Sequence, residues 1–227
     1  MKRAVELFTF EDLTSTSSHV TGVWRTYSEP VPEEWFLSVA VTPWEMVVTR
    51  QAAGTSITVR GPETRASAAP IPTDAEFYGI TFSAGTYMPQ FDMRLLVDRG
   101  VTLPVVSDIA FWLDGSTWEL PKPDNADVFV DRLVGAGLLV HDPVVPAALH
   151  DDVPGLSRRS VERRVLRATG LTRGTIRQIR RAEHAVDLLA AGVPAPEVAR
   201  RAGYADQPHL TRSLRRFVGR TPSQLAG

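Results

Sequence analysis

The sequence predicts an α+β fold in which a β-rich sandwich or barrel domain precedes an all-α domain with two helix-turn-helix units joined by a long helix. Three observations predict it. Short alternating segments rich in β-branched and aromatic residues fill the first half of the chain. Apolar residues recur at helical spacing in the second half, and the net charge changes sign between the two halves. At 227 residues the chain is long enough to build two cores.

Residues 1–118 are expected to form the β-rich domain. Pro70 and Pro72 interrupt a further extended segment, which should lie at an edge or between strands. Gln51-Ala52-Ala53-Gly54 separates two of the predicted strands as a hairpin turn would. The predicted strands are His19–Ser28, Trp44–Gln51, Thr55–Gly61 and Glu76–Ser83.

Two segments near the end of this domain are predicted to be helical instead. They are Phe91–Gly100 and Leu103–Leu113. The second segment would place Val106, Ile109, Ala110 and Leu113 on one side of a helix.

Residues 119–123, which include two prolines, are expected to link this domain to an all-α domain at 124–227. The first helix-turn-helix unit is expected at about 143–169, the linker helix at about 175–191 and the second unit at about 195–218. The predicted helices are Asn125–Gly137, Pro143–Leu149, Ser157–Thr169, Thr175–Ala191, Glu197–Ala202 and Gln207–Val218.

The second unit has the densest set of local signals. Gly203 can turn with positive φ between two short helices. Asp206 is placed to cap the second of these helices, and Pro208 falls in its first turn, where no backbone donor is needed. Leu210, Leu214 and Phe217 recur at i, i+4 and i+7 and should be buried together. The opposite face is polar and basic, which suits a helix that enters a major groove.

These residues carry a resemblance to a known family. The segments Ala199-Arg200-Arg201-Ala202-Gly203-Tyr204-Ala205-Asp206-Gln207-Pro208-His209-Leu210-Thr211-Arg212 and Phe217-Val218-Gly219-Arg220-Thr221-Pro222 resemble the second helix-turn-helix of AraC/XylS-type transcription regulators. Ala168-Thr169-Gly170-Leu171-Thr172 is similar to the end of the family's first recognition helix, with alanine in place of the usual acid. Gly79-Ile80-Thr81-Phe82-Ser83-Ala84-Gly85-Thr86 resembles a phrase of the cupin-like sensor domains that many of these regulators carry. The resemblance implies a cupin-like N-terminal domain and a sequence-specific DNA-binding regulator.

The charge distribution is consistent with a polyanionic partner at the C-terminal end only. Gly155–Gly227 contains fifteen arginines and five acidic residues, a net charge of +10. The remaining residues carry ten basic and twenty-one acidic side chains, a net charge of −11. A basic segment joined to an acidic body indicates that only the C-terminal part meets a polyanion, and the family resemblance implies that this polyanion is double-stranded DNA.

Two sets of DNA-contacting residues are expected. Arginine can bond O6 and N7 of guanine together, so arginines on the outer face of each recognition helix are candidates to read bases. The resemblance to the family's base-facing positions implies the base-reading candidates Arg159, Glu162, Arg163, Gln207, Pro208, Thr211 and Arg212. For Glu162 a salt bridge to Arg158 is an equal alternative. The phosphate-binding candidates are Arg158, Arg164, Arg167, Arg173, His209, Arg215 and Arg216, and His209 has packing as its alternative role.

Neither catalysis nor a cofactor is expected. The chain has no cysteine, and His19 is the one histidine before His141, so the N-terminal domain lacks the histidine-rich metal site of cupin enzymes. No metal, cofactor or membrane contact is predicted, and the protein is expected in the cytoplasm. A small-molecule effector, a homodimer and, for an activator, RNA polymerase are the further partners considered; the effector site is unknown. Two alternatives stay open for the β domain: protein contact alone, or a metal-free enzyme fused to a DNA-binding domain.

Overall fold

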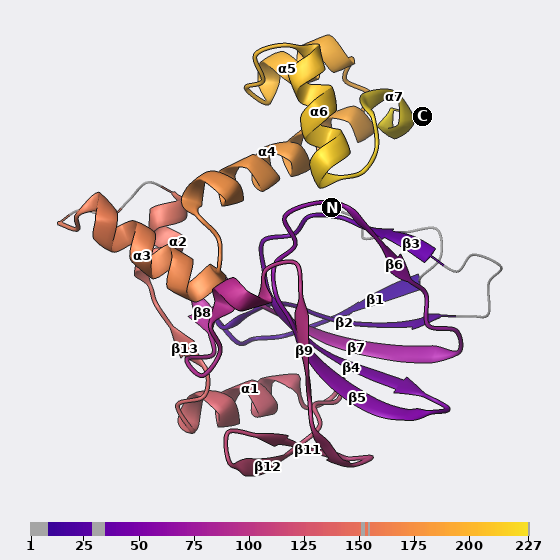
Figure 1. Ribbon diagram of the computed structural model, residues 1–227, viewed down its shortest axis with the longest axis vertical. Helices are drawn as coiled ribbons and strands as arrows, with labels where there is room; N and C mark the ends of the chain where they lie inside the picture. Colours follow the sequence, from indigo (N-terminus) through magenta and orange to yellow (C-terminus); the bar gives the residue numbers. More distant parts are fainter. Residues whose placement is uncertain (1–8, 29–34, 151–152, 154, 227) are drawn as a thin grey trace.

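The computed structural model describes residues 9–28, 35–150, 153 and 155–226 (Figure 1). Its first half is built on a six-stranded antiparallel sheet in the order β1-β2-β7-β4-β5-β9. The predicted strands are confirmed within a residue at either end. The strands of this sheet are β1 (Thr9–Leu13), β2 (Val20–Ser28), β4 (Glu45–Gln51), β5 (Gly54–Arg60), β7 (Ala75–Phe82) and β9 (Gly100–Leu103).

A short two-stranded ribbon lies beside one end of the main sheet (Figure 1). It pairs β3 (Trp35–Ser38) with β6 (Ser67–Pro70), and a bridge between Val41 and Glu63 extends it. Its strands form no ladder with the six-stranded sheet, so side-chain packing must hold it there. We call residues 35–41 and 63–70 the ribbon.

The predicted helix at Leu103–Leu113 is wrong. This segment ends β9 and then forms β10 (Val105–Ser107) and β11 (Ala110–Leu113), which pair with each other and with β12 (Ser116–Glu119). Val106 and Ile109, two of the side chains expected on one side of that helix, are 58% and 62% exposed. The spacing of the apolar residues was compatible with a helix and with strands, and pairing with neighbouring strands favoured the strands.

The predicted helix at Phe91–Gly100 is also largely wrong. Only one turn of 3₁₀ helix, η1 (Met93–Leu96), forms there. Asp92 caps this turn, and the chain re-enters extended structure at Val97. Met93 and Leu96 are buried in the core, and one helical turn is enough to place both side chains there.

Helix α1 (Ala126–Gly135) is attached to the β-rich half. Its Asp127 carboxylate accepts hydrogen bonds from the hydroxyls of Ser15 and Thr16, at 2.6 and 2.7 Å. After α1 the chain forms β13 (Val140–His141), which pairs with β8 (Thr86–Tyr87). Helix α1, which was expected in the C-terminal domain, is therefore hydrogen-bonded to the β-rich half. The domain limits at 118 and 124 stay predictions.

The remaining helices follow the predicted order. Helix α4 joins α2 and α3 to the group α5, α6 and α7, with the β-rich half below it in Figure 1. Thr172 caps α4, so this helix begins two residues before the predicted start. The helices are α2 (Val144–Leu149), α3 (Arg158–Thr169), α4 (Arg173–Ala190), α5 (Ala195–Arg201), α6 (Gln207–Phe217) and α7 (Pro222–Leu225).

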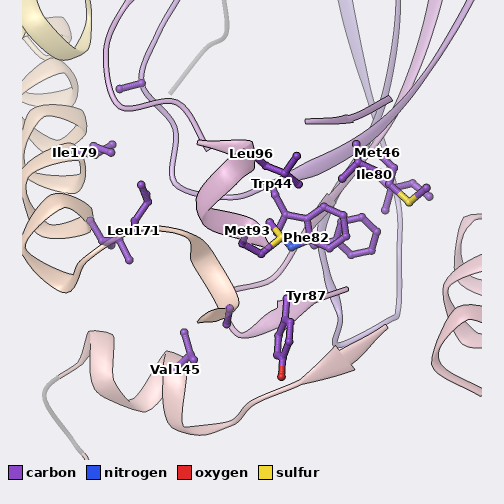
Figure 2. Packing of buried hydrophobic residues seen from close by; sticks show 14 of the residues in the cluster. Trp44, Met46, Ile80, Phe82, Tyr87, Met93, Leu96, Val145, Leu171 and Ile179 are labelled. Carbon is purple, nitrogen blue, oxygen red and sulfur yellow. The ribbon is translucent and has the colours of Figure 1, made fainter. Parts of the chain in front are cut away.

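The apolar core runs without a break from the sheet into the helices (Figure 2). Trp44 stacks on Phe82 with ring centroids 4.0 Å apart, and both belong to the same cluster as Val145 of α2 and Ile179 of α4. The two halves are therefore packed against each other rather than joined by a flexible tether. Within the described residues, no helix is both long and apolar enough to cross a bilayer.

Candidate nucleic-acid interface

Helix α6 presents the second set of predicted DNA contacts. The Asp206 side chain accepts from the backbone N–H of His209 at 2.6 Å, which confirms it as the cap. Leu210, Leu214 and Phe217 are buried, as their spacing predicted. The opposite face carries Gln207, Pro208, Arg212, Arg215 and Arg216, all exposed, and Thr211, which is half-buried.

The turn before α6 is braced by a residue that the sequence did not single out. Arg181 of α4 lies with its guanidinium 4.5 Å from the centre of the Tyr204 ring and donates to the carbonyl of Gly203 at 3.2 Å. The Tyr204 hydroxyl shares a 3.0 Å hydrogen bond with Ser213, and its ring meets His209 edge-on at 5.1 Å. The half-buried His209 ring therefore packs on Tyr204, and its contact with phosphate stays a prediction. Little in the sequence indicated the contact of Arg181, because an arginine on a long helix can face solvent, DNA or another helix.

Helix α5, the first helix of this unit, contains two ion pairs between its own residues. The carboxylate of Glu197 accepts from Arg200 at 2.5 Å and from Arg201 at 2.6 Å. These two guanidinium groups lower the pKa of Glu197 to about 2. Arg200 and Arg201 therefore already have an anionic partner on the surface of the protein.

Helix α3 presents the first set of predicted DNA contacts. The Ser157 hydroxyl accepts from the backbone N–H of Ser160, which confirms the predicted cap, and Val161, Val165 and Ala168 are buried. Among the predicted base readers of this helix, Arg159 and Arg163 are exposed and Glu162 is half-buried. Arg158, a predicted phosphate contact, is exposed as well.

Three of the predicted phosphate contacts have partners within the protein. Arg164 donates to both carboxylate oxygens of Asp142, at 3.1 and 3.2 Å. Arg167 lies 3.7 Å from the same carboxylate and 5.1 Å from the centre of the Tyr87 ring. Arg173 donates to the carbonyl of Ala148 at 2.8 Å. These arginines hold the first unit in place, and their contact with phosphate stays a prediction.

Asp142 is the centre of this polar contact. Its carboxylate is only 5% exposed, and its backbone N–H donates to the carbonyl of Gly85 at 2.9 Å. The neighbouring His141 shares a 3.1 Å hydrogen bond with the Thr86 hydroxyl and faces His19 at 6.0 Å between ring centroids. Burial and the nearby His19 lower the pKa of His141. Asp142 therefore fastens the first unit to the turn between β7 and β8.

The β-rich half contacts the C-terminal end of both recognition helices. Gly170, the left-handed cap of α3, approaches Met93 so closely that an added Cβ would lie 2.4 Å from the Met93 carbonyl oxygen. At the end of α6, the ribbon supplies two backbone donors. The N–H of Ala40 donates to the carbonyl of Phe217, and the N–H of Ala66 donates to that of Arg216, both at 2.8 Å. The last carbonyls of a helix have no partner within it, so these two bonds cap α6.

Helix α4 sets the separation between the two units. Its 18 residues correspond to a length of ~27 Å at 1.5 Å per residue. This length is close to the ~34 Å between successive major grooves on one side of a duplex. Helix α4 thus joins the helices that carry these exposed residues, and the entry of α3 and α6 into neighbouring grooves stays a prediction.

A second candidate site lies in the β-rich half. A cavity of about 290 Å³ opens between the six-stranded sheet and the ribbon. Its walls are mostly apolar, with Glu45, Arg60 and Glu63 at one end. The apolar lining includes Phe10, Trp24, Phe36, Leu37, Val39 and Phe77. In the described parts of the chain, no group of three or more histidine or acidic side chains is placed to hold a metal ion.

Comparison with known proteins agrees with this geometry. Residues 152–227 match the family model described as a helix-turn-helix domain. This part of the chain is a helix-turn-helix domain. The chain is also 30% identical over 135 residues to the HTH-type transcriptional regulator RipA of Corynebacterium glutamicum. That match covers 49% of this chain and 41% of RipA, so the chain spans less than half the length of this relative.

Solved structures of ToxT from Vibrio cholerae are similar over most of the chain. One is 11% identical, covers 97% of this chain and 98% of the ToxT chain, and has a TM-score of 0.40. Another, ToxT bound to (E)-4-(8-methylnaphthalen-1-yl)but-3-enoic acid, is 11% identical and covers 96% of this chain and 98% of its own, with a TM-score of 0.39.

Proposed function

We propose that this chain is a sequence-specific DNA-binding transcription regulator. The observation that carries the proposal is the pair of capped helices, α3 and α6, whose exposed faces carry arginines and which the single helix α4 joins. The helix-turn-helix domain at residues 152–227 and the partial similarity to the regulator RipA support it. DNA is therefore its macromolecular partner, and the cytoplasm is where we propose that it acts.

The test is selection of DNA from a randomised duplex library by the full chain, followed by footprinting on the selected sequence. We expect a defined site and a binding constant that falls steeply with salt, because arginine contacts release counterions from the phosphates. Equal affinity for the selected site and for a shuffled duplex would contradict the proposal.

We further propose that the cavity of the β-rich half takes a small-molecule effector. Sites for such ligands are concave, largely apolar and equipped with a few polar groups, and the cavity beneath the ribbon has this character. The expected role of the N-terminal domain as a sensor is consistent with it. No catalytic step is proposed for this site, and a metabolite that binds should be recovered unchanged.

A second candidate function for the same half is protein contact, and a specific observation favours it. The small sheet exposes Val106 (58%), Ile109 (62%) and Trp112 (46%) on the side of the molecule away from α4 to α7 in Figure 1. Grouped exposed apolar side chains are typical of contact surfaces. Sedimentation of the full chain with and without Ile109→Asp tests for a homodimer through this surface. RNA polymerase remains the expected partner of an activator.

A further inference from the structure

The ribbon both lines the cavity and donates hydrogen bonds to the end of α6. It therefore connects the cavity to a helix that is predicted to contact DNA. Leu37 and Val39 line the cavity, while Ala40 follows directly and caps α6. On the other strand, Ala69 lines the cavity and Ala66 caps α6. Both hydrogen bonds to the end of α6 therefore come from the ribbon, which also forms one wall of the cavity.

The contact between the ribbon and α6 is also close in its side chains. An added Cβ at Gly219 would lie 2.8 Å from Cδ2 of Leu37 and 3.1 Å from Cβ of Ala66. Gly219 has φ +74, a conformation that favours glycine. The chain after α6 thus lies directly against the ribbon, and a side chain at residue 219 would have to displace Leu37.

The ribbon's own position depends on what lies beneath it. Two strands alone are marginally stable in water, and the ribbon forms no ladder with the main sheet. Apolar side chains that line an open cavity of this size are in contact with water, and covering them is favourable. A ligand in the cavity would cover these side chains and hold the ribbon more firmly.

The polar end of the cavity limits the chemistry of such a ligand. Arg60 pairs with Glu45 at 3.6 Å and with Glu63 at 3.1 Å, so two carboxylates face one guanidinium. The carboxylates are the more enclosed groups, with 15% and 17% of their side chains exposed against 38% for Arg60. This excess of negative charge favours a cation or a neutral hydrogen-bond donor and disfavours a carboxylate.

We propose that the cavity binds an apolar molecule bearing an amine or another donor group, and that the bound molecule tightens the ribbon's hold on the C-terminal end of α6. This inference rests on the proposed effector role. The first unit is fastened separately, through Asp142 and Gly170, so the ligand acts on the second unit. By linkage, the docked α6 raises the affinity for the ligand by the same factor as the ligand strengthens the docking.

The experiment uses the full chain and 1-naphthylmethylamine as the probe, with 1-naphthoic acid as the matched anion. We expect the amine to bind at least about tenfold more tightly than the acid. It should slow amide hydrogen exchange at Ala40 and Ala66 while leaving the amide of Asp142 unchanged. Equal or tighter binding of the acid would overturn the ligand class, and uniform slowing at all three amides would overturn the link to α6.

Substitutions test the link without relying on one probe. Ala69→Leu should fill part of the cavity and slow exchange at Ala40 and Ala66 in the absence of any ligand. Gly219→Ala should weaken amine binding about tenfold relative to Gly192→Ala, which shares the backbone conformation (φ +78) but has no atom within 4 Å of the added Cβ. If neither the amine nor Ala69→Leu slows exchange, or if both glycine variants bind the amine alike, the proposal is wrong. None of these measurements contains DNA, so a failure of the proposed DNA recognition would not alter them.

Discussion

The backbone N–H of Ala66 donates a 2.8 Å hydrogen bond to the carbonyl of Arg216, joining the ribbon of the β-rich half to the end of a recognition helix. With the parallel bond from Ala40 to Phe217, it caps the carbonyls that α6 leaves without partners. A buried carbonyl left without a partner costs about 1–3 kcal/mol. Hydrogen bonds from the β-rich half therefore contribute to the stability with which α6 is held in place.

Arg212→Ala is expected to relax the sequence preference at one base pair. Arg212 is exposed on the face of α6 opposite the buried Leu210, Leu214 and Phe217. Loss of a bidentate contact to guanine should cost about 1–3 kcal/mol on the selected site and little on random DNA. Binding to the selected site, to its single-base variants and to random duplex measures this.

Arg216→Ala is the comparison for that variant. Its guanidinium lies 4.9 Å from the centre of the Phe217 ring near the end of α6, where a phosphate contact is predicted. We expect weaker binding to every sequence and a salt dependence reduced by about one unit of slope. Were Arg212→Ala to weaken all duplexes equally, Arg212 would be a phosphate contact and not a base reader.

The two units are expected to protect about 20 base pairs on one side of the duplex, since α4 spaces them by about one helical turn. Inserting about 5 base pairs, half a turn, between the two halves of the selected site should place the second half on the opposite side and abolish its protection. Footprinting of both duplexes with the full chain checks this. Unchanged protection of both halves after insertion would mean that α4 does not fix the separation.

Asp142→Asn is expected to destabilise the fold by about 1–2 kcal/mol, because it removes a buried charge that faces Arg164 and Arg167. The value is modest because 42% of the Arg164 side chain is exposed and water screens the pair. Urea unfolding measures the change. Asp131→Asn, an exposed carboxylate on α1, is the control and should leave the midpoint in place.

Stability is expected to fall as the medium becomes acidic, in part through His141. Its pKa is lowered in the folded state by burial and by His19, so the folded protein prefers the neutral ring. The unfolded chain then takes up the proton first, and stability is lost as the pH falls below the ordinary histidine pKa of about 6.5. Unfolding at about pH 7.5 and about pH 5.5 should show a smaller loss for His141→Gln than for the natural chain. An identical loss in both proteins would assign the effect to other groups.

Arg181→Met should weaken binding to all duplexes without changing the preferred sequence. The methionine keeps most of the aliphatic stem but loses the contact with the Tyr204 ring and the bond to the Gly203 carbonyl. Together these losses amount to about 1–2 kcal/mol of stability in the second unit. Arg180→Met, the neighbouring substitution on α4, is the matched control. A change in base preference for Arg181→Met would instead make Arg181 a DNA contact.

Local chemistry explains what could be predicted from the sequence. Asp206 and Ser157 cap the helices they were expected to cap, because capping depends on a side chain and the next few backbone donors. The buried stripe of α6 follows from its spacing in the same way. At Leu103–Leu113, by contrast, a helix and a pair of strands were both consistent with the pattern, and contacts with β12 and β9 decided the outcome.

The rest depended on contacts between distant segments. The bonds from Ala40 and Ala66 to α6 use backbone atoms, which every residue carries, so no residue type marks them. The partner of Arg164 and Arg167 is one aspartate some twenty residues earlier, and nothing in the charge pattern distinguishes Asp142 from its neighbours. The cavity beneath the ribbon required the spatial meeting of strands far apart in the chain.

The pairing of β13 with β8 has a consequence for synthesis of the chain. Strand β8 can acquire this partner only when residues 140–141 have left the ribosome, long after the six-stranded sheet has been translated. Asp127 of α1, which binds Ser15 and Thr16, is likewise made late. Since domains generally fold as units during translation, the β-rich half should remain incomplete until α1 and β13 have emerged. A ribosome stalled shortly after residue 118 would then carry a nascent chain that is still sensitive to protease, and one stalled well beyond residue 141 would not.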